Sequence, residues 1–553
     1  MDAASGARPT DRPLRSAMCL LALLTGIAAF AVGTCREAER ADPSPSRDAA
    51  LIDEDFAQNT VLGHIVATGA LVARPRPETL RDPPPARRGM LRFEPAGAPA
   101  EAWPSTGLAR AIAAAHPERD FVSIAVDPRD WDDPDVGIVA NAERRGDAWI
   151  RGACVTLFHE GRAVAEGAAG VGVHGDSSRR HARKSLRLHL TPRFGATVRP
   201  SRLLPGALGD SLVLHNDRRR LCFVNPIGYE LLRQLGVDAP RTRPVRLLVN
   251  GELLPGIFFV TERLDESHLA ARSGSRRVRW FQERDGRRPR DYRRLVLMLR
   301  DRAAERVPPL DPHVDVDAAL GWIVGVLLLA PYDCQQGVAY QRPDDRRWRW
   351  IAWDVDWGLG PWPEAIHGSP LEPRDVVEYL ARPDHYDLRG RLFAFAMTRD
   401  VALRRQLLAR LRDALDHRAP YSWWQATLAR YREHTERLLD PDERRFELDS
   451  LESIDAFVRA RPAALRRELD AAFALGRPHR IEIRVPDGAS VSVDGHRHEG
   501  GWSGHAFAGE HVQLAADPPF VLRIPGEPDE RAATRRVLEM TGPVVVEVVH
   551  RSR

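Results

Sequence analysis

The chain has 553 residues, and its 81 basic and 77 acidic side chains give a formal net charge of +4 at pH 7. This length predicts about three or four domains of ordinary size and therefore a modular function. Because the two signs of charge are interspersed, no overall field would steer the protein to nucleic acid, and we expect no nucleic-acid partner.

Residues 1–35 carry three arginines followed by an apolar run from about residue 17 to residue 33. This order is typical of a signal peptide or N-terminal membrane anchor, and Cys35 offers a site for lipid attachment. We therefore expect an exported protein of the cell envelope or the extracellular space. It would meet a membrane only through this segment, and the sequence does not indicate an oligomeric state.

Residues 36–118 are rich in proline and arginine, which is typical of a linker with weak structure. Within it, residues 59–67 suit a strand and residues 108–115 a short helix. Beyond Cys19 and Cys35, the remaining cysteines are too few and too scattered for a disulfide framework or a zinc site, so we expect no zinc chemistry. They are Cys154, Cys222 and Cys334.

The region 119–215 is predicted to be mainly β, because short apolar runs alternate with turn residues. A helix follows at residues 223–235, and Gly236 is placed where that helix would end. The expected strands are 121–126, 149–150, 153–158, 163–166, 184–190 and a strand ending at 213–217.

Further along, Asn250-Gly251 predicts a hairpin between strands at 244–249 and 256–261. An arginine-rich loop is expected at 276–294, an apolar helix at 316–329, and a second hairpin from 338–340 and 347–352. The pattern is helical from about 375 to 475, and residues 478–553 alternate as the strands of a small β domain. The strands expected there are 480–485, 490–493, 510–514, 520–524 and 544–549.

Lys184 is the only lysine in the chain. The other positive side chains are arginines, so the single lysine indicates a role that requires a compact ammonium. That role would be binding of a phosphate or formation of a Schiff base. The turn at 175–178, with Ser177 and Ser178, adds backbone and hydroxyl donors just before it. The alternative is that one lysine simply persists in an arginine-rich chain.

The stretch 349–360 is a hydrophobic strand that ends in Asp354 and Asp356 and continues into Gly358 and Gly360. Two carboxylates at the exit of a strand suit a magnesium ion that bridges phosphates, although acidic turns after strands are also common. Asp333 lies 21 residues upstream, after a helix and before a hairpin. Protein kinases place their catalytic aspartate before a metal-binding aspartate in this order.

With these motifs the chain resembles the CotH family, named for spore coat protein H, whose members are atypical protein kinases. The likeness covers about residues 119–475. It is carried by residues 121–128 with 135–141, 172–179 with 184–188, 250–262, 353–358 and 457–461.

The resemblance implies an α+β fold: an atypical protein-kinase-like core at 119–475, with an N-terminal β-rich part and a helical C-terminal lobe, followed by a small β-sandwich-like domain at 478–553. ATP and Mg²⁺ or Mn²⁺ are the implied cofactors. The implied site residues are Lys184, Ser177 and Ser178 on the nucleotide, Glu262 or Glu230 beside Lys184, Asp333 as the catalytic aspartate, and Asp354, Asp356 and Gln336 on the metal.

The expected activity is transfer of the ATP γ-phosphate to serine or threonine of a surface, envelope or coat protein. Gln336 lies where the family usually has asparagine, so the alternative is a catalytically impaired pseudokinase that serves as a binding, adhesion or structural coat module. A third interpretation is another transfer reaction, such as adenylylation or glutamylation.

Overall fold

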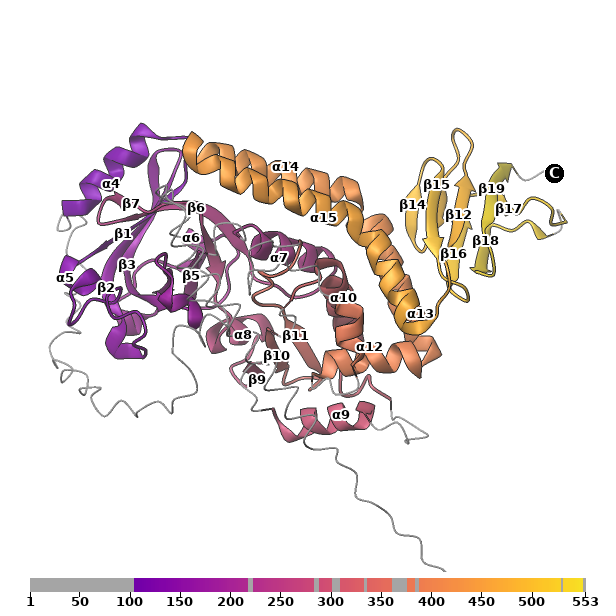
Figure 1. The fold of residues 1–553 in the computed structure, drawn as a ribbon, viewed down its shortest axis with the longest axis horizontal. Coiled ribbons are helices and arrows are strands. Elements are labelled where there is room, and N and C mark those ends of the chain that lie inside the picture. The colour runs from indigo at the N-terminus through magenta and orange to yellow at the C-terminus, as the bar shows by residue number, and fades with distance from the viewer. Residues whose placement is uncertain are drawn as a thin grey trace, which may run out of the picture. The chain divides into compact units, whose positions relative to one another are not determined.

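The computed structural model describes residues 104–216, 222–282, 288–300, 309–332, 336–360, 375–382, 387–528 and 531–550. These residues form both helices and strands (Figure 1), as the sequence predicted. The predicted export segment and the strand at 59–67 lie outside them. Within the described ranges, no helix is both long and apolar enough to cross a bilayer.

The N-terminal part is an eight-stranded sheet in the order β1-β2-β3-β4-β5-β8-β6-β7. A further, parallel pairing of β1 with β6 joins the sheet to itself, whereas the other neighbouring strands are antiparallel. The strands are β1 Phe121–Val126, β2 Arg151–His159, β3 Arg162–His174, β4 Ser185–His189, β5 Ser211–His215, β6 Thr242–Val249, β7 Glu252–Leu253 and β8 Phe258–Glu262.

The predicted hairpin after β6 is confirmed. Asn250 and Gly251 have φ of 51° and 84°, which are the two left-handed positions of a type I′ turn. The returning segment is divided, because β7 and β8 pair with different parts of β6.

Strand β1 is buried on both faces, which explains its unbroken apolar sequence. Val122 and Ile124 belong to the main cluster of the sheet, whereas Phe121 packs with Ala109 and Ala113 of helix α4 (Pro104–Ala115). The short helix expected at 108–115 is therefore confirmed, and it belongs to the packed structure although the residues before 119 were expected to be a linker.

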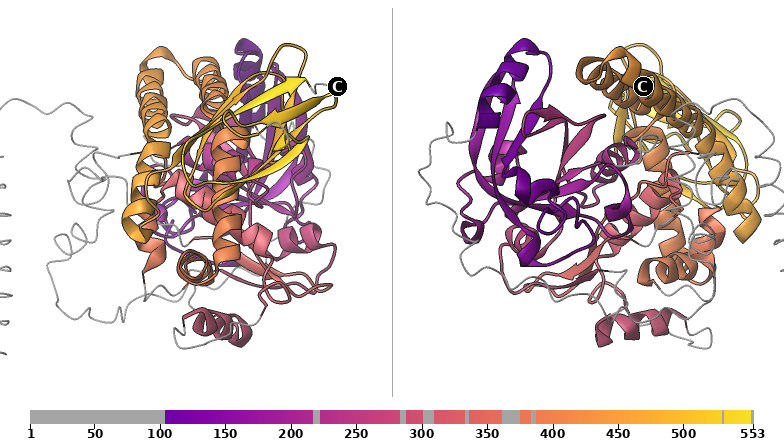
Figure 2. Two further views of the ribbon diagram at one scale, coloured as in Figure 1. Left: turned by 90° about the vertical axis from the view of Figure 1, so that its right-hand side faces the viewer. Right: turned by 60° about the vertical axis from the view of Figure 1, so that its left-hand side comes forward.

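Helices dominate the chain after the sheet. Helix α10 (Val316–Leu329) is apolar on every side and buried for most of its length, as expected for a central helix. Helices α14 and α15 run side by side in opposite directions (Figures 1 and 2). The main helices besides α10 are α7 Val224–Gln234, α8 Glu266–Ser273, α11 Val376–Ala381, α12 Leu388–Thr398, α13 Val401–Asp413, α14 Tyr421–Leu438 and α15 Pro441–Phe473.

The arginine-rich segment expected to be a loop contains a strand and the start of a helix in its described part, so that prediction is wrong. It contains β9 (Arg279–Gln282), which pairs with β10 (Val338–Gln341), and the start of α9 (Arg290–Arg300). Phe281 and Tyr292 pack edge to face against Trp348, and the exposed arginines around them conceal the apolar periodicity. Strand β11 (Trp348–Ile351) completes this three-stranded sheet.

The C-terminal residues form two four-stranded sheets around a shared apolar cluster, with orders β15-β12-β19-β17 and β14-β13-β16-β18. The sequence predicted five of these strands and missed β14, β15 and β18. The strands are β12 His479–Arg484, β13 Val491–Val493, β14 His496–His498, β15 Trp502–Ala506, β16 His511–Ala516, β17 Phe520–Arg523, β18 Arg535–Glu539 and β19 Val544–His550.

Candidate active site

Helix α7 fixes the loop that carries Asp354. Asp354 has φ of 58°, and its backbone N–H donates to the Tyr229 hydroxyl at 3.0 Å. The next N–H, from Val355, donates to Asn225 Oδ1 at 2.7 Å. A Cβ on Gly228 would lie 2.6 Å from Val355 Cγ2, so only glycine lets the helix approach this closely. The loop of the metal-binding candidate is therefore held against helix α7 by two hydrogen bonds and close packing.

The same loop is bonded to the end of α10. Leu359 N–H donates to Leu329 O at 2.8 Å, and Tyr332 N–H donates to Trp357 O at 3.2 Å. Asp333, the predicted catalytic residue, follows Tyr332 in sequence and lies outside the described residues. Tyr332 nevertheless ties the chain immediately before Asp333 to the loop of Asp354 and Asp356.

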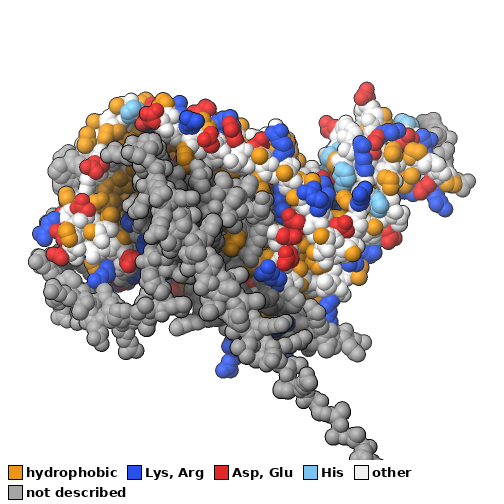
Figure 3. Space-filling model, viewed as in Figure 1, with side chains coloured by type: hydrophobic (Ala, Val, Ile, Leu, Met, Phe, Trp, Pro, Cys, Tyr) orange, Lys and Arg blue, Asp and Glu red, His pale blue; other side chains and the backbone are white. Residues whose placement is uncertain are grey.

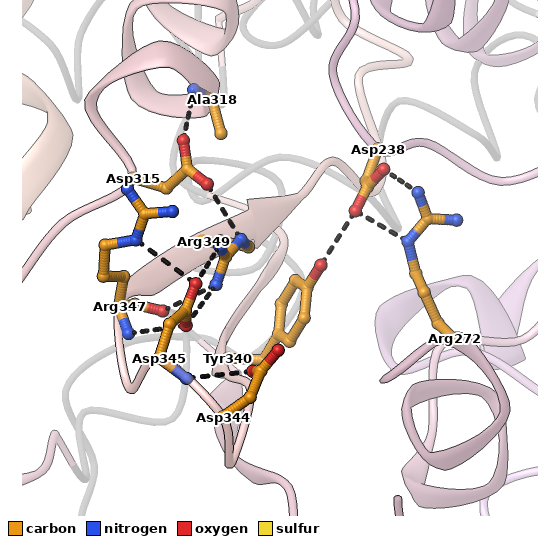
Figure 4. A network of polar contacts seen from close by, with 9 residues as sticks. All are labelled: Asp238, Arg272, Asp315, Ala318, Tyr340, Asp344, Asp345, Arg347 and Arg349. Carbon is orange, nitrogen blue, oxygen red and sulfur yellow. Dashed lines mark hydrogen bonds and ion pairs between the residues drawn. The ribbon is translucent and has the colours of Figure 1, made fainter. Parts of the chain in front are cut away.

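A polar network holds the strands that lead into this loop (Figure 4). Asp238 accepts hydrogen bonds from Tyr340 Oη at 2.9 Å and from Arg272 Nε at 2.6 Å. Arg349 donates to Asp345, which holds the pKa of that carboxyl well below its usual range. The same arginine pairs with Asp315 at 2.9 Å, and Asp315 caps α10. The network thus fixes β11 relative to α10.

Trp353 connects the Asp354 loop with the eight-stranded sheet. Its ring centroid is 6.2 Å from that of His174 at the end of β3 and 6.1 Å from that of His215 at the end of β5. His174 pairs with Ser185, the residue after Lys184. Burial and the charge of Arg263 lower the pKa of His174 well below its ordinary value, so the imidazole is neutral at pH 7. The segments that carry Lys184 and Asp354 therefore meet at Trp353.

Lys184 lies directly before β4 and is half-buried, and burial lowers its pKa. Its ammonium donates to the carbonyl of Arg179 at 2.7 Å. The Arg179 guanidinium donates to four backbone carbonyls, those of Gly175, Val173, Ala142 and Arg144. The turn before the lysine is therefore closed by its own side chains.

Of the two serines in this turn, Ser178 packs beneath Gly175. A Cβ on Gly175, whose φ is 107°, would lie 2.0 Å from Ser178 Oγ, so the turn requires glycine. Ser177 begins a short 3-10 helix, Ser177–Arg180, and its side chain lies outside the described part.

A pocket of roughly 280 Å³ opens beside the turn. Within it, Arg145 pairs with Asp176 and Arg180 pairs with Glu143, so acidic side chains neutralise much of its positive charge. The pocket is lined by Glu143, Arg145, Asp176, Arg179 and Arg180.

Glu262 has partners other than the one predicted from sequence. It is buried, and its carboxylate accepts from Leu208 N–H and Arg241 N–H, both at 2.7 Å. The register places Glu262 opposite Leu212, which is opposite Leu188. That position is four residues along β4 from Lys184, or about 13 Å. The expected contact is absent from the described structure.

Glu230, the other candidate, lies on α7 but faces α14. It accepts from Tyr431 Oη at 2.8 Å and pairs with Arg430. Neither predicted acid therefore contacts the ammonium of Lys184 among the described residues.

The possible metal ligands are all oxygen donors. Asp354 and Asp356 are half-buried carboxylates in one loop, and Gln336 is a half-buried amide just before β10. Mg²⁺ and Mn²⁺ bind such oxygens, so these residue types fit a divalent cation. Sequence reasoning missed the supporting roles of Asn225, Tyr229 and Arg179. The one signal available in the sequence was Asn225, a polar residue on the apolar face of the predicted helix.

Comparisons with known proteins identify the family of this chain. The family described as CotH kinase protein matches residues 171–291 and 287–464, which together span just over half of the chain. A solved structure of the Helicobacter pylori proinflammatory kinase CtkA is similar at 11% identity and a TM-score of 0.22, covering 47% of this chain and 92% of that one. None of the curated proteins matches. On the extent of the family match, the chain belongs to the CotH kinase family.

Proposed function

We propose that this protein is an exported atypical protein kinase that transfers the ATP γ-phosphate to serine or threonine of a surface, envelope or coat protein. The observation that supports this most directly is the meeting of two segments at Trp353. One segment brings the only lysine of the chain, and the other brings Asp354 and Asp356. Phosphoryl transfer requires a cation on the phosphates and carboxylates for a metal.

In the proposed reaction, the Lys184 ammonium neutralises phosphate oxygens and orients the nucleotide. Asp354, with Asp356 and Gln336, would hold Mg²⁺ or Mn²⁺, which supplies further positive charge to the phosphates when bound. Asp333 orients the acceptor hydroxyl and takes its proton. The hydroxyl oxygen bonds to the γ-phosphorus as the bond to the bridging oxygen breaks, and ADP leaves.

The test is incorporation of label from γ-labelled ATP by the purified chain, alone and with envelope proteins, in the presence of Mg²⁺ or Mn²⁺. Lys184→Ala, Asp333→Ala and Asp354→Ala should each lower incorporation by about a hundredfold or more. Asp487→Ala is the matched control, because Asp487 is an exposed carboxylate of the C-terminal sheets. Incorporation that survives all three site variants would refute the assignment.

Gln336 favours a second candidate function, a pseudokinase that binds nucleotide without transferring phosphate. Glutamine can ligate a metal through its carbonyl, but its stem is longer than that of asparagine. This alternative predicts that ATP stabilises the wild type, but not Lys184→Ala, in thermal unfolding while no label is incorporated. If Gln336→Asn creates activity, the asparagine side chain is the metal ligand that the natural chain lacks.

Export is tested separately by fractionation of cells that produce the natural chain. We expect the protein in the envelope or the medium, and a chain without residues 1–35 in the cytoplasm. Mass spectrometry of the labelled acceptor distinguishes phosphate from an adenylyl or glutamyl group.

A further inference from the structure

A cluster of imidazoles and a carboxylate lies far from the candidate active site in sequence. Asp413 ends α13, His417 belongs to the π-helix Ala414–Arg418, and His496 begins β14. One oxygen or ring nitrogen from each of the three residues lies within 4.8 Å of the others. Asp413 Oδ1 is 2.5 Å from His496 Nε2 and 3.6 Å from His417 Nδ1. Figure 3 shows histidine side chains gathered on the surface of the C-terminal sheets.

His417 is the buried member of this cluster. Its side chain is 6% exposed, and its Nδ1 has no hydrogen-bond partner among the described residues. Its other nitrogen, Nε2, lies 3.0 Å from Nε2 of His498, so one of these two nitrogens carries a proton and the other accepts it. If His417 is the donor, the lone pair of its Nδ1 faces the carboxylate of Asp413, and the two repel each other. A cation bound between them removes that repulsion.

We propose that Asp413, His417 and His496 bind a divalent transition metal with the preferences of Zn²⁺. Imidazole nitrogens with one carboxylate oxygen suit Zn²⁺ better than Mg²⁺ or Ca²⁺, and three protein ligands leave a position for water. His498 is a positioning residue, because an acceptor on the second nitrogen of a ligating histidine fixes its tautomer and orientation.

Binding requires one local change. The rings of His417 and His496 are stacked, with centroids 4.2 Å apart and an angle of 8° between them. A metal lies in the plane of an imidazole that ligates it, so one ring must turn. His496 is 37% exposed and has room to do so, whereas His417 is also stacked on Trp502.

The metal would link two parts of the chain that are distant in sequence, the end of α13 and the C-terminal sheets. The cysteine count argued against zinc chemistry but had no bearing on a site made of histidine and aspartate. The relevant sequence signal is the spacing Asp413-x-x-x-His417 together with His496-x-His498. Residues four apart in a helix, or two apart in a strand, lie on one face.

The experiment uses the full chain without a polyhistidine tag. Zn²⁺ binding is measured by calorimetry in excess Mg²⁺, and Co²⁺ serves as a spectroscopic probe of ligand number. We expect one tight Zn²⁺ per chain in the wild type and in Asp354→Ala, and at least a tenfold loss of affinity in His417→Gln, His496→Gln and Asp413→Asn. His498→Ala should lose about 10- to 100-fold.

His505→Gln is the matched control, because His505 is an exposed histidine of the neighbouring strand β15. Its affinity for Zn²⁺ should equal that of the wild type. Circular dichroism verifies that every variant is folded. The proposal is overturned if the wild type binds no Zn²⁺, in which case the cluster is a metal-free histidine contact. It is equally overturned if the cluster variants bind Zn²⁺ as tightly as His505→Gln does.

Discussion

Arg179 shows how one side chain can determine the shape of a loop. Its guanidinium donates to four backbone carbonyls, and its own carbonyl accepts from Lys184. We expect Arg179→Lys to destabilise the protein by about 1–3 kcal/mol in urea unfolding, because an ammonium cannot span the same carbonyls. ATP affinity should fall with it. Arg162→Lys, an exposed exchange on β3, should leave both unchanged.

His189 predicts a pH dependence of stability. Burial and the charge of Arg187 lower its pKa to about 4, whereas an unfolded histidine has a pKa near 6.5. Between these values the unfolded chain binds a proton that the folded chain does not, so stability falls as pH decreases from 6.5 towards 4. Wild type should lose about 1–2 kcal/mol more than His189→Gln between pH 7 and pH 5. The exposed His511→Gln should behave as the wild type does.

At the level of elements, Gly228→Ala in α7 sets the higher helix propensity of alanine against the close packing of this position on Val355. Alanine in place of glycine normally stabilises a helix by about 1 kcal/mol, but here its Cβ would overlap Val355 beside Asp354. We therefore expect Gly228→Ala to lower both stability and activity. Adding Val355→Ala should restore part of the loss by removing the opposing methyl. In α4, where a Cβ at position 107 meets no atom within 4 Å, Gly107→Ala should stabilise the protein.

The elements that could be predicted from sequence are those whose burial matches their periodicity. Helix α10 was predicted with its observed bounds because it is apolar throughout, and the β6 hairpin because Asn250-Gly251 requires left-handed backbone. Strands β14 and β18 were missed because charged or polar residues occupy most of their positions. The strand that follows Lys184 was predicted to begin at the lysine itself, and in the structure it begins one residue later, at Ser185. The partners of Glu262 were not, because they depend on strand register and on backbone amides distant in sequence.

At the scale of the whole molecule, a buried charge cluster connects α13 with the C-terminal sheets. Arg412, whose side chain is 3% exposed, pairs with Glu510 and with Asp494 at 2.9 Å, and donates to His511 O at 3.0 Å. Burial raises the pKa of Glu510, and Arg412 opposes that effect. Among the described residues, Arg412 therefore supplies three of the polar contacts that join α13 to the C-terminal sheets.

Arg412→Met should therefore uncouple the C-terminal sheets from the rest of the chain. Removing one partner of a buried pair leaves an uncompensated carboxylate and costs about 3–5 kcal/mol. In calorimetry with a chelator present, we expect the C-terminal sheets to unfold at a lower temperature than the remainder. Adding Glu510→Gln should recover part of the loss, because the remaining side chain is then neutral.

Arg405→Met is the matched control on the same helix. Arg405 lies 3.9 Å from Glu539 in an exposed pair, and its removal should cost less than about 1 kcal/mol. Equal effects of the two arginine exchanges would mean that the buried cluster does not hold the C-terminal sheets. If Arg412→Met destabilises the C-terminal sheets but leaves phosphate incorporation unchanged, those sheets are not needed for the proposed kinase activity.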